Sequence, residues 1–248
     1  MKLLIDSGNT RLKWQVLGAD GECCGEGVSG AQTARAVTLA QAVRRFGPQL
    51  RQIVIAHVAG AALAAEIRAE LSALSVQPLW VRAQAQGWGV TNGYAVAHQL
   101  GADRWAALVG ARARRAVPWL VVMAGTATTV DVLDEHGYFH GGFILPGVNM
   151  MRRSLAENTA QLSDSPGEVC PMPNNTQDAI ASGCLYAQVG AIRQMFQQHL
   201  AHRPGAACLI GGGHGQLLAE HLDLPVELVA HPVLSGLAVI AAQPSFRE

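Results

Sequence analysis

An internal duplication limits the fold of this 248-residue chain more than any other feature of its sequence. When Gly8 is aligned with Gly125, the apolar residues 3–5 fall on the apolar residues 120–122. Each half then follows the pattern of strand, loop, strand, turn and strand before its first helix. The repeat predicts two α/β domains of similar topology.

The boundary between the two predicted domains lies near Pro118, where no linker separates them. We therefore expect a first domain at residues 1–116 and a second domain at residues 117–248. Two α/β domains in direct contact favour a ligand cleft between them, because small molecules usually bind where domains meet.

Hydrophobic periodicity and turn residues predict the elements of each half. Strands are expected within residues 2–16, after Asp20-Gly21, at 52–56, 79–83 and 119–123, in a run ending at 133, and at 138–144 and 207–210. Helices are expected at 31–46, 61–74, 102–116, about 148–162, 176–201 and about 232–242, with one more after the glycine loop 211–215. Residues 86–93 are expected to form a polar loop.

Composition and charge exclude several classes of protein. The chain has 18 Lys and Arg and 18 Asp and Glu residues, so no nucleic-acid partner is expected, because such binders usually carry a basic surface. The apolar runs are too short to cross a membrane, and the N-terminus lacks the pattern of a signal peptide. The five cysteines form no CxxC pair, which favours structural thiols in a reducing cytoplasm.

The first motif that can carry chemistry is a small-residue loop between two predicted strands. It consists of Asp6, Ser7, Gly8, Asn9, Thr10, Arg11, Leu12 and Lys13. Successive backbone N–H groups in such a hairpin can bind a phosphate, Asp6 can hold Mg²⁺ through water, and Lys13 can supply positive charge. An ordinary β-turn, with Asp and Asn as turn formers, explains the same residues equally well.

A second loop, residues 125–131, reads Gly-Thr-Ala-Thr-Thr-Val-Asp, and the duplication places it opposite the first. Two facing hairpins of small and hydroxyl residues can hold the phosphates of a nucleotide. Asp131 is interpreted either as a second carboxylate on the metal side or as a structural residue at a strand end.

A third motif, Gly101-Ala102-Asp103-Arg104, begins a predicted helix. Asp103 is expected either to cap that helix or to act as a carboxylate base. Arg104 is placed to bind an anionic group of a substrate or to stabilise developing charge, and the sequence leaves both roles open.

Six motifs in order resemble those of type III pantothenate kinases, which belong to the actin-like and sugar-kinase ATPase superfamily. The family pattern is DxGNT, GADR, DxGTAxTxD, GGxIxPG, an NT pair with a downstream Gly, and a late GG. This chain has the corresponding motifs at 6–10, 101–104, 125–131, 141–147, Thr176 with Gly183, and 211–213.

This resemblance implies duplicated actin-like ATPase domains of the ribonuclease H-like type and ATP-dependent phosphorylation of pantothenate, the first step of coenzyme A synthesis. It also implies Mg²⁺, a monovalent cation, and a homodimer in which the partner subunit contributes to the substrate pocket. Asp103 matches the general base of the family. The ATP contacts map to residues 6–13 and Thr126, with Asp6 on the metal side. The pantothenate contacts map to Tyr94, Gly101, Ala102, Asp103, Arg104 and Thr176.

One position departs from the family pattern. Met123 stands where the family has the Asp that holds the monovalent cation. A thioether is a poor ligand for K⁺ or NH₄⁺, because K⁺ prefers hard oxygen ligands. The monovalent-cation site is therefore doubtful in this chain.

Two alternative functions share this fold. One is a kinase for another small alcohol or a carboxylate, which the GADR and NT motifs disfavour. The other is a regulatory or accessory homologue that is weakly active or inactive, and Met123 is the one feature that favours it. An assay of ATP consumption with and without pantothenate discriminates among the three.

Overall fold

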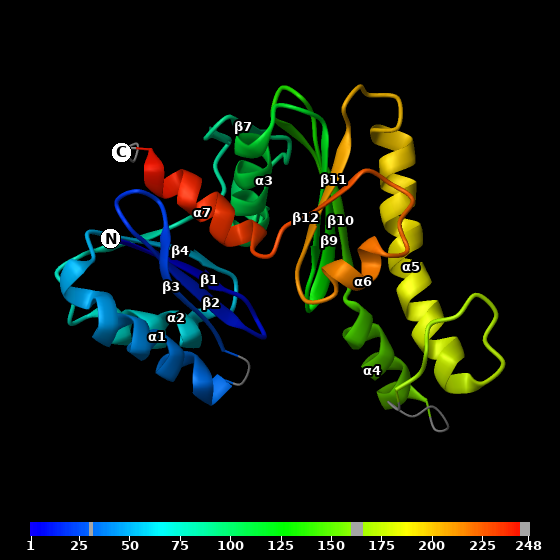
Figure 1. The fold of residues 1–248 in the computed structure, drawn as a ribbon, viewed down its shortest axis with the longest axis horizontal. Coiled ribbons are helices and arrows are strands. Elements are labelled where there is room, and N and C mark those ends of the chain that lie inside the picture. The colour runs from blue at the N-terminus through cyan, green and yellow to red at the C-terminus, as the bar shows by residue number, and fades with distance from the viewer. Residues whose placement is uncertain (30–31, 160–165, 244–248) are drawn as a thin grey trace. The chain divides into compact units, whose positions relative to one another are not determined.

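The computed structural model describes residues 1–29, 32–159 and 166–243, without the side chains of residues 32–37. The chain divides into two compact units (Figure 1). The first unit combines Met1–Arg115 with Pro232–Glu248, and the second is Ala116–His231. Within the described ranges, no helix is long and apolar enough to cross a lipid bilayer.

The first unit is built on a five-stranded sheet in the order β3-β2-β1-β4-β5. β1 is its central strand, antiparallel to β2 and parallel to β4. The strands are β1 (Lys2–Ser7), β2 (Leu12–Leu17), β3 (Cys23–Ser29), β4 (Gln52–His57) and β5 (Pro78–Trp80). The helices are α1 (Gln32–Phe46), α2 (Ala61–Leu71), α3 (Ala102–Arg114) and α7 (Pro232–Ala242), with 3₁₀ turns at Gly47–Gln49 and Ala97–Gln99.

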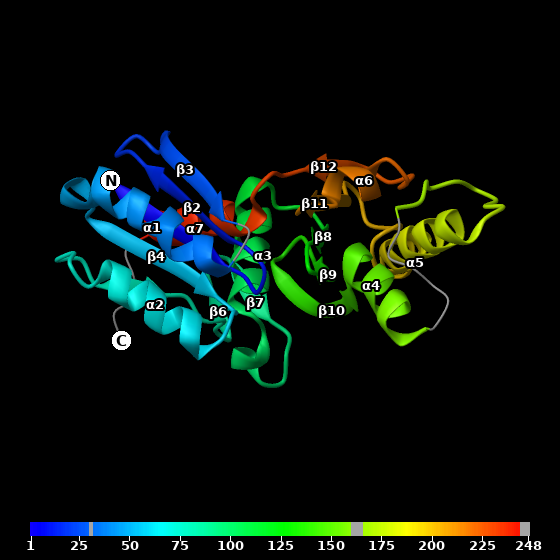
Figure 2. The same cartoon turned by 90° about the horizontal axis from the view of Figure 1, so that it is seen from below.

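Side chains of β1 alternate between the two faces of this sheet, because a strand has a period of two. Leu3 and Ile5 join a buried cluster with Leu39 of α1 and Ile67 of α2. Figure 2 shows α1 and α2 side by side over that face. The opposite face, which carries the buried Leu4, packs against α7 and α3. Asp6 shares the face of Leu4, and Ser7 shares the face of Ile5.

Helices α3 and α7 pack closely on each other within the first unit. Gly110 and Gly236 permit this approach: a Cβ at Gly110 would lie 3.0 Å from the Gly236 nitrogen, and a Cβ at Gly236 would overlap the Ala106 carbonyl. The compact units therefore differ from the predicted domains 1–116 and 117–248 in the C-terminal segment. That segment contacts β1, β4 and α3 of the first unit.

The second unit contains five strands in the order β12-β11-β8-β9-β10. They are β8 (Trp119–Ala124), β9 (Ala127–Leu133), β10 (Tyr138–Pro146), β11 (Ala207–Gly211) and β12 (Val226–Leu228). Its helices are α4 (Val148–Asn158), α5 (Thr176–His199) and α6 (Gly215–Ala219).

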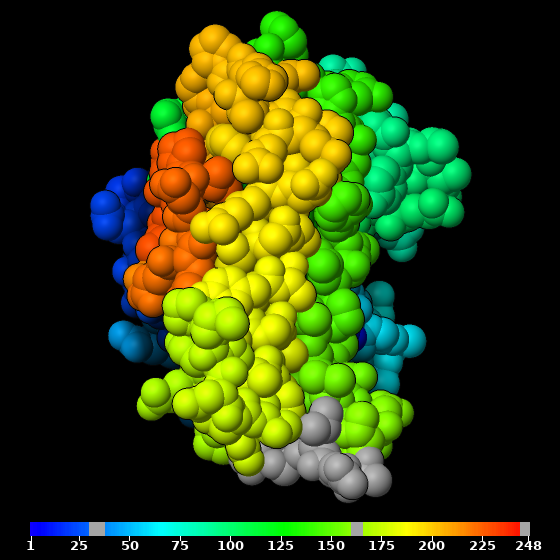
Figure 3. All heavy atoms as spheres, turned by 90° about the vertical axis from the view of Figure 1, so that its right-hand side faces the viewer, coloured from blue at the N-terminus to red at the C-terminus, as the bar shows by residue number. Residues whose placement is uncertain are grey.

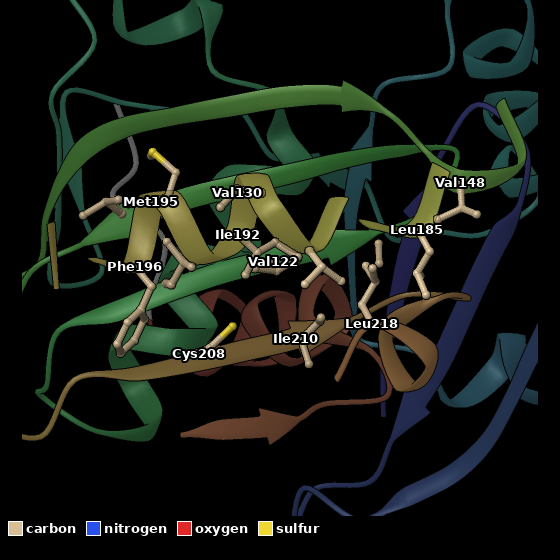
Figure 4. Packing of buried hydrophobic residues seen from close by; sticks show 14 of the residues in the cluster. Val122, Val130, Val148, Leu185, Ile192, Met195, Phe196, Cys208, Ile210 and Leu218 are labelled. Carbon is tan, nitrogen blue, oxygen red and sulfur yellow. The ribbon is translucent and has the colours of Figure 1, made fainter. Parts of the chain in front are cut away.

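One face of this second sheet packs against the long helix α5. Ile192 and Phe196 of α5 lie over Val122 and Val130 of the sheet (Figure 4). Figure 3 shows the outer side of α5 running along the surface of this unit. Five of the six residues of β8 are buried, and its nearly continuous apolar sequence is typical of a strand in the interior of a sheet.

The two units have the same topology, which confirms the predicted duplicated α/β class. In each, three antiparallel strands (β1-β2-β3 or β8-β9-β10) are followed by two strands added in parallel on the other side of the first (β4-β5 or β11-β12). Corresponding helices occupy corresponding places in the chain, so α3 and α7 close the two copies.

Most predicted elements are present, with shorter ends. The helix expected at 61–74 ends at Leu71, the helix expected at 102–116 ends at Arg114, and α4 ends at Asn158. The expected end of that last helix, from residue 160, lies outside the described residues. The strand expected at 79–83 is Pro78–Trp80, because β4 pairs with it over only three positions.

Three short strands have no sequence prediction. Residues 86–93, expected as a loop, contain β6 (Gln86–Gly87) and β7 (Val90–Asn92). The turn between them has positive φ at Trp88 and Gly89, and Trp is an unusual residue for that conformation, which hid the hairpin. The strand β12 is also too short for an alternating pattern.

Candidate active site

The β1–β2 turn forms as the sequence predicts, as a tight hairpin. Ser7 pairs with Leu12, and the Gly8 N–H donates to the Arg11 carbonyl at 3.1 Å. Leu12 is anchored away from the turn: its side chain is in the core, and its N–H and carbonyl both engage the Ser29 hydroxyl. The main-chain polar atoms of Leu12 are therefore both engaged with β3.

Asp6 and Lys13 face each other across β1 and β2. Their side chains form an ion pair with a Lys13 Nζ to Asp6 Oδ2 distance of 3.9 Å. Burial raises the pKa of Asp6 from 3.8 to about 6; Lys13 lowers it, and the carboxylate of Asp103 raises it further. The hairpin thus carries a desolvated carboxylate whose charge interacts with Asp103.

Asp103 lies in the first turn of α3, and Gly101 is the N-cap. Asp103 is therefore not the N-cap residue, and the prediction that it caps the helix is wrong. Its Oδ1 instead accepts the N–H of the next residue, Arg104, at 2.8 Å. Burial raises the pKa of Asp103, while the Arg104 N–H and guanidinium oppose that rise. A buried carboxylate with a raised pKa is a stronger base than one in water.

Gly101 leaves room for this carboxylate. A Cβ at position 101 would lie 2.5 Å from the Asp103 Oδ1 atom. The small residue at the N-cap therefore has a steric reason that the sequence pattern alone does not reveal.

Arg104 is buried, with 4% of its surface exposed. Its Nη1 donates to the Tyr94 hydroxyl at 3.0 Å, and its guanidinium lies 5.6 Å from the centre of the Tyr94 ring. Asn92 supports the Tyr94 loop, because its Oδ1 accepts the Tyr94 N–H and its Nδ2 donates to the Ala97 carbonyl. The structure therefore brings together two of the predicted pantothenate contacts.

The β8–β9 turn of the second unit is held by backbone contacts. The Gly125 N–H donates to the Ala127 carbonyl at 3.0 Å, and the Gly147 N–H donates to the Thr126 carbonyl at 2.9 Å. A Cβ at Gly147 would overlap the carbonyls of residues 125 and 126, and a Cβ at Gly212 would overlap the Ala124 carbonyl. These motif glycines are thus required by packing around the turn.

Asp131 and Met123 lie on the same sheet face as each other. Met123 pairs with Thr129, and Asp131 pairs with Val121 on one side and Gly142 on the other. Asp131 is 1% exposed, and a Cβ at Gly142 would overlap its Oδ1. This burial favours the structural interpretation of Asp131.

Thr176 is the first residue of α5, after the N-cap Asn175. The Asn175 Oδ1 accepts the Asp178 N–H at 3.0 Å, which confirms the N-cap pattern of the sequence. Thr176 itself is exposed.

His57 has no sequence prediction but contacts the hairpin directly. Its Nδ1 lies 3.0 Å from the Ser7 hydroxyl. Parallel pairing of Ser7 with His57 between β1 and β4 produces this contact. Only the sheet register, which the sequence does not reveal, could have identified it.

The described residues fit Mg²⁺ better than K⁺. Asp6 offers a hard carboxylate oxygen, and Mg²⁺ in kinases is typically held by one or two carboxylates, water and phosphate oxygens. No group of three or more His, Cys, Asp or Glu residues suited to a metal occurs in the described part of the chain. Met123 offers only a soft thioether where the family cation site needs oxygen.

Comparisons with known proteins agree on one family. A family profile described as type III pantothenate kinase matches residues 2–198. The type III pantothenate kinase of Aromatoleum aromaticum is 49% identical, covering 98% of this chain and 98% of that protein. The one from Azoarcus sp. is 47% identical, covering 98% of this chain and 91% of that protein.

Two solved structures are similar in fold. A Sinorhizobium meliloti protein described as a 2-dehydro-3-deoxygalactonokinase matches with a TM-score of 0.62 at 18% identity, covering 99% of this chain and 100% of that one. A Campylobacter jejuni protein described as a Baf family transcriptional activator matches with a TM-score of 0.60 at 19% identity, covering 97% and 98%. These likenesses support the predicted actin-like and sugar-kinase ATPase fold, and the full-length relatives place the chain in the type III pantothenate kinase family.

Proposed function

We propose that this chain transfers the γ-phosphoryl group of ATP to the primary hydroxyl of pantothenate, giving 4'-phosphopantothenate in the first step of coenzyme A synthesis. Family membership carries the reaction, and one structural observation supports its location. Asp103, partly buried at the start of α3, lies close enough to Asp6 of the β1–β2 hairpin for their charges to interact.

In this proposal Asp103 is the general base. It accepts the proton of the pantothenate hydroxyl as that oxygen attacks the γ-phosphorus, and the bond from phosphorus to the β,γ-bridging oxygen breaks to release ADP. Burial raises the pKa of Asp103 and so strengthens it as a base. A positioned base contributes about 10²- to 10⁴-fold to such a reaction.

Asp6–Lys13 is proposed as the phosphate-binding segment of the first unit. The hairpin presents backbone N–H groups, and Lys13 supplies positive charge. Asp6 would hold Mg²⁺ on the phosphate side of the hairpin, and the ion would supply positive charge to the phosphates. In the second unit, Thr126 is the proposed phosphate contact by its family motif.

Pantothenate is proposed to contact Tyr94, residues 101–104 and Thr176. Arg104 is suited to the pantothenate carboxylate, because a guanidinium binds a carboxylate with two parallel hydrogen bonds. The Tyr94 hydroxyl, 3.0 Å from Nη1, orients that guanidinium.

A homodimer and a cytoplasmic location complete the proposal. The second unit exposes the apolar side chains Phe143 and Ile144 on β10 and Met150 and Leu155 on α4, which suits an interface. All five cysteines are free thiols, which suits a reducing compartment. Light scattering on purified protein tests the dimer.

The experiment that tests the function is ADP release measured with ATP and Mg²⁺, with and without pantothenate. We expect pantothenate-dependent release and a product heavier than pantothenate by one phosphoryl group. Release that pantothenate does not stimulate would contradict the proposal. An inactive homologue gains no support from the site, since Asp6, Lys13, Asp103 and Arg104 are all present and interact.

A further inference from the structure

We propose that His57 is a positioning residue for ATP, which holds the β1–β2 hairpin from the face of the sheet opposite Asp6. This inference rests on the proposed ATP-binding role of the hairpin. It is carried by two hydrogen bonds of one imidazole, to the Ser7 hydroxyl and to the Gly60 carbonyl.

The first step concerns where Ser7 points. Neighbouring residues of a strand face opposite sides of the sheet, so the Ser7 side chain lies on the face of Ile5, away from the Asp6 carboxylate. Ser7 is fully buried, with 0% of its surface exposed. The Ser7 hydroxyl therefore supports the hairpin from the face opposite Asp6. A contact of Ser7 with phosphate would come from its main chain.

The second step concerns the protons of the imidazole. The Gly60 carbonyl can only accept, so His57 Nε2 carries a proton and donates to it at 2.8 Å. In the neutral ring, Nδ1 then accepts, and the Ser7 hydroxyl donates to it at 3.0 Å. The Gly60 contact thus selects the tautomer that holds Ser7.

The third step is the rigidity of this arrangement. The His57 ring lies edge-on to Trp80, with centroids 5.7 Å apart, and the Arg68 guanidinium lies 4.5 Å from the Trp80 ring centre. The Val58 N–H also donates to the Ser7 carbonyl at 3.0 Å. Ser7, the last strand residue before the turn, is therefore fixed through both its main chain and its side chain.

The consequence concerns ATP rather than pantothenate. Loosening Ser7 loosens the turn that follows it, so ATP loses affinity in the ground state and the transition state alike. Such uniform loss raises KM and leaves kcat nearly unchanged. The Tyr94 and Arg104 contacts are on other segments, so the KM for pantothenate is expected to stay the same.

Three variants of His57 separate the two hydrogen bonds. His57→Ala removes both and is expected to raise the KM for ATP about fivefold to tenfold, because only the bond to Ser7 acts on the hairpin and one lost hydrogen bond has an effect of that size. His57→Asn keeps an acceptor near the position of Nδ1 and is expected to restore the KM for ATP to within about twofold of the native value. His57→Gln keeps a donor toward Gly60 only and is expected to behave like His57→Ala.

His221→Asn is the matched control. His221 also bonds a backbone carbonyl, with Nδ1 2.9 Å from the Leu217 oxygen, and lies edge-on to Tyr186 with centroids 6.0 Å apart. It lies in the second unit, where its main chain bonds Leu218 and Arg193. Its substitution is expected to leave both KM values unchanged, whatever it does to thermal stability.

A second measurement uses Ser7→Ala and the double variant with His57→Ala. If the two residues act through one bond, the double variant raises the KM for ATP no more than the larger single effect. Independent, multiplying effects would contradict the proposal. So would a native KM for ATP in His57→Ala, or recovery by His57→Gln but not by His57→Asn.

Calorimetric titration with Mg-ATP alone separates this inference from the proposed function. If the native protein shows no pantothenate-dependent turnover, the proposed function fails, and ATP affinity still tests His57. Weaker ATP binding by His57→Ala, recovered in His57→Asn, supports the positioning role. Equal ATP binding by the native protein and His57→Ala overturns it.

Discussion

The β1–β2 turn and the β8–β9 turn occupy the same place in the duplicated topology but differ in charge. Asp6 and Lys13 face each other beside the first turn, whereas Met123 and Thr129 face each other beside the second. The first turn has four residues between its closing pair, and the second has three. The strand arrangement is the same in both copies, while an ion pair directly beside the turn occurs in the first.

Burial explains why the charged copy is specialised. Burial raises the pKa of Asp6 to about 6, although the ion pair with Lys13 opposes that rise. Met123 is neutral, so its partial burial needs no opposite charge nearby. The hydrogen bonds described above for the second turn are backbone to backbone. The two turns therefore differ in side-chain chemistry: the first is flanked by an ion pair, and the second by a thioether and a hydroxyl.

The largest expected effect comes from Asp103→Asn. The amide keeps the size of the side chain but has no basic oxygen, so kcat should fall on the order of 10²-fold or more while the fold is retained. Steady-state kinetics and a thermal melt check this. Asp20→Asn is the control, because Asp20 accepts one backbone N–H at 3.1 Å in an exposed turn and should leave kcat unchanged.

Near-normal turnover in a folded Asp103→Asn protein would restrict Asp103 to supporting the start of α3. The first unit would then no longer contain the proposed general base. A comparable loss of kcat in Asp20→Asn would show that the effect is not specific to the site.

The next effect comes from Asp6→Asn, which should impair activity and stabilise the fold. Loss of one charged ligand oxygen should weaken Mg²⁺-dependent ATP use about tenfold. Because burial raises the pKa of Asp6 to about 6, the native fold loses stability as pH rises from about 4 through 6, by up to about 3 kcal/mol. The amide has no such dependence.

Urea unfolding of the native protein and Asp6→Asn at pH 4 and pH 7.5 measures this effect. The variant should gain stability relative to the native protein only at the higher pH. An equal difference at both pH values would contradict the raised pKa, and Mg²⁺ titrations that match the native protein would remove Asp6 from the metal side.

A smaller effect is expected for Tyr94→Phe. The change deletes the hydroxyl that accepts from Arg104 at 3.0 Å and keeps the ring, so the KM for pantothenate should rise about threefold to tenfold. The KM for ATP should not change. A shift in the KM for ATP alone would place the Tyr94 loop on the nucleotide side.

Much of this arrangement follows from sequence, because local patterns determine it. The hairpin of residues 6–13, the helix start at 101–104 and the N-cap Asn175 depend on neighbours in the chain. The packing of α7 on α3 and the contact of His57 with Ser7 join segments far apart in sequence. Periodicity contains no information on such pairings, so neither could be predicted.

The same limit applies to glycines. Gly147 and Gly212 belong to motifs that the sequence identifies without a reason for the glycine, and the structure shows close approach of the backbone around the β8–β9 turn. A collision between distant backbone atoms is a tertiary property. The sequence indicated that these positions matter, but not why.

The smallest expected effect concerns the monovalent cation and Met123. Since the thioether is a poor K⁺ ligand, turnover should change little when K⁺ or NH₄⁺ is added to a buffer that initially contains no sodium or potassium. Met123→Asp should make the response steep by adding a carboxylate to the second turn. A native enzyme with almost no activity until K⁺ is added would contradict this prediction. It would indicate that a monovalent cation binds despite the thioether of Met123.

Within the first unit, the account assigns ATP binding to the β1–β2 hairpin and proton transfer to Asp103. The most direct test of this assignment is calorimetric titration of Mg-ATP into the native protein, Asp103→Asn and Asp6→Asn, without pantothenate. If the hairpin binds ATP and Asp103 acts only as base, Asp103→Asn should bind Mg-ATP within about twofold of the native Kd, because a group that acts only in the transition state leaves ground-state binding unchanged. Asp6→Asn should bind about tenfold more weakly. Equal weakening in both variants, or native binding in both, would contradict the account.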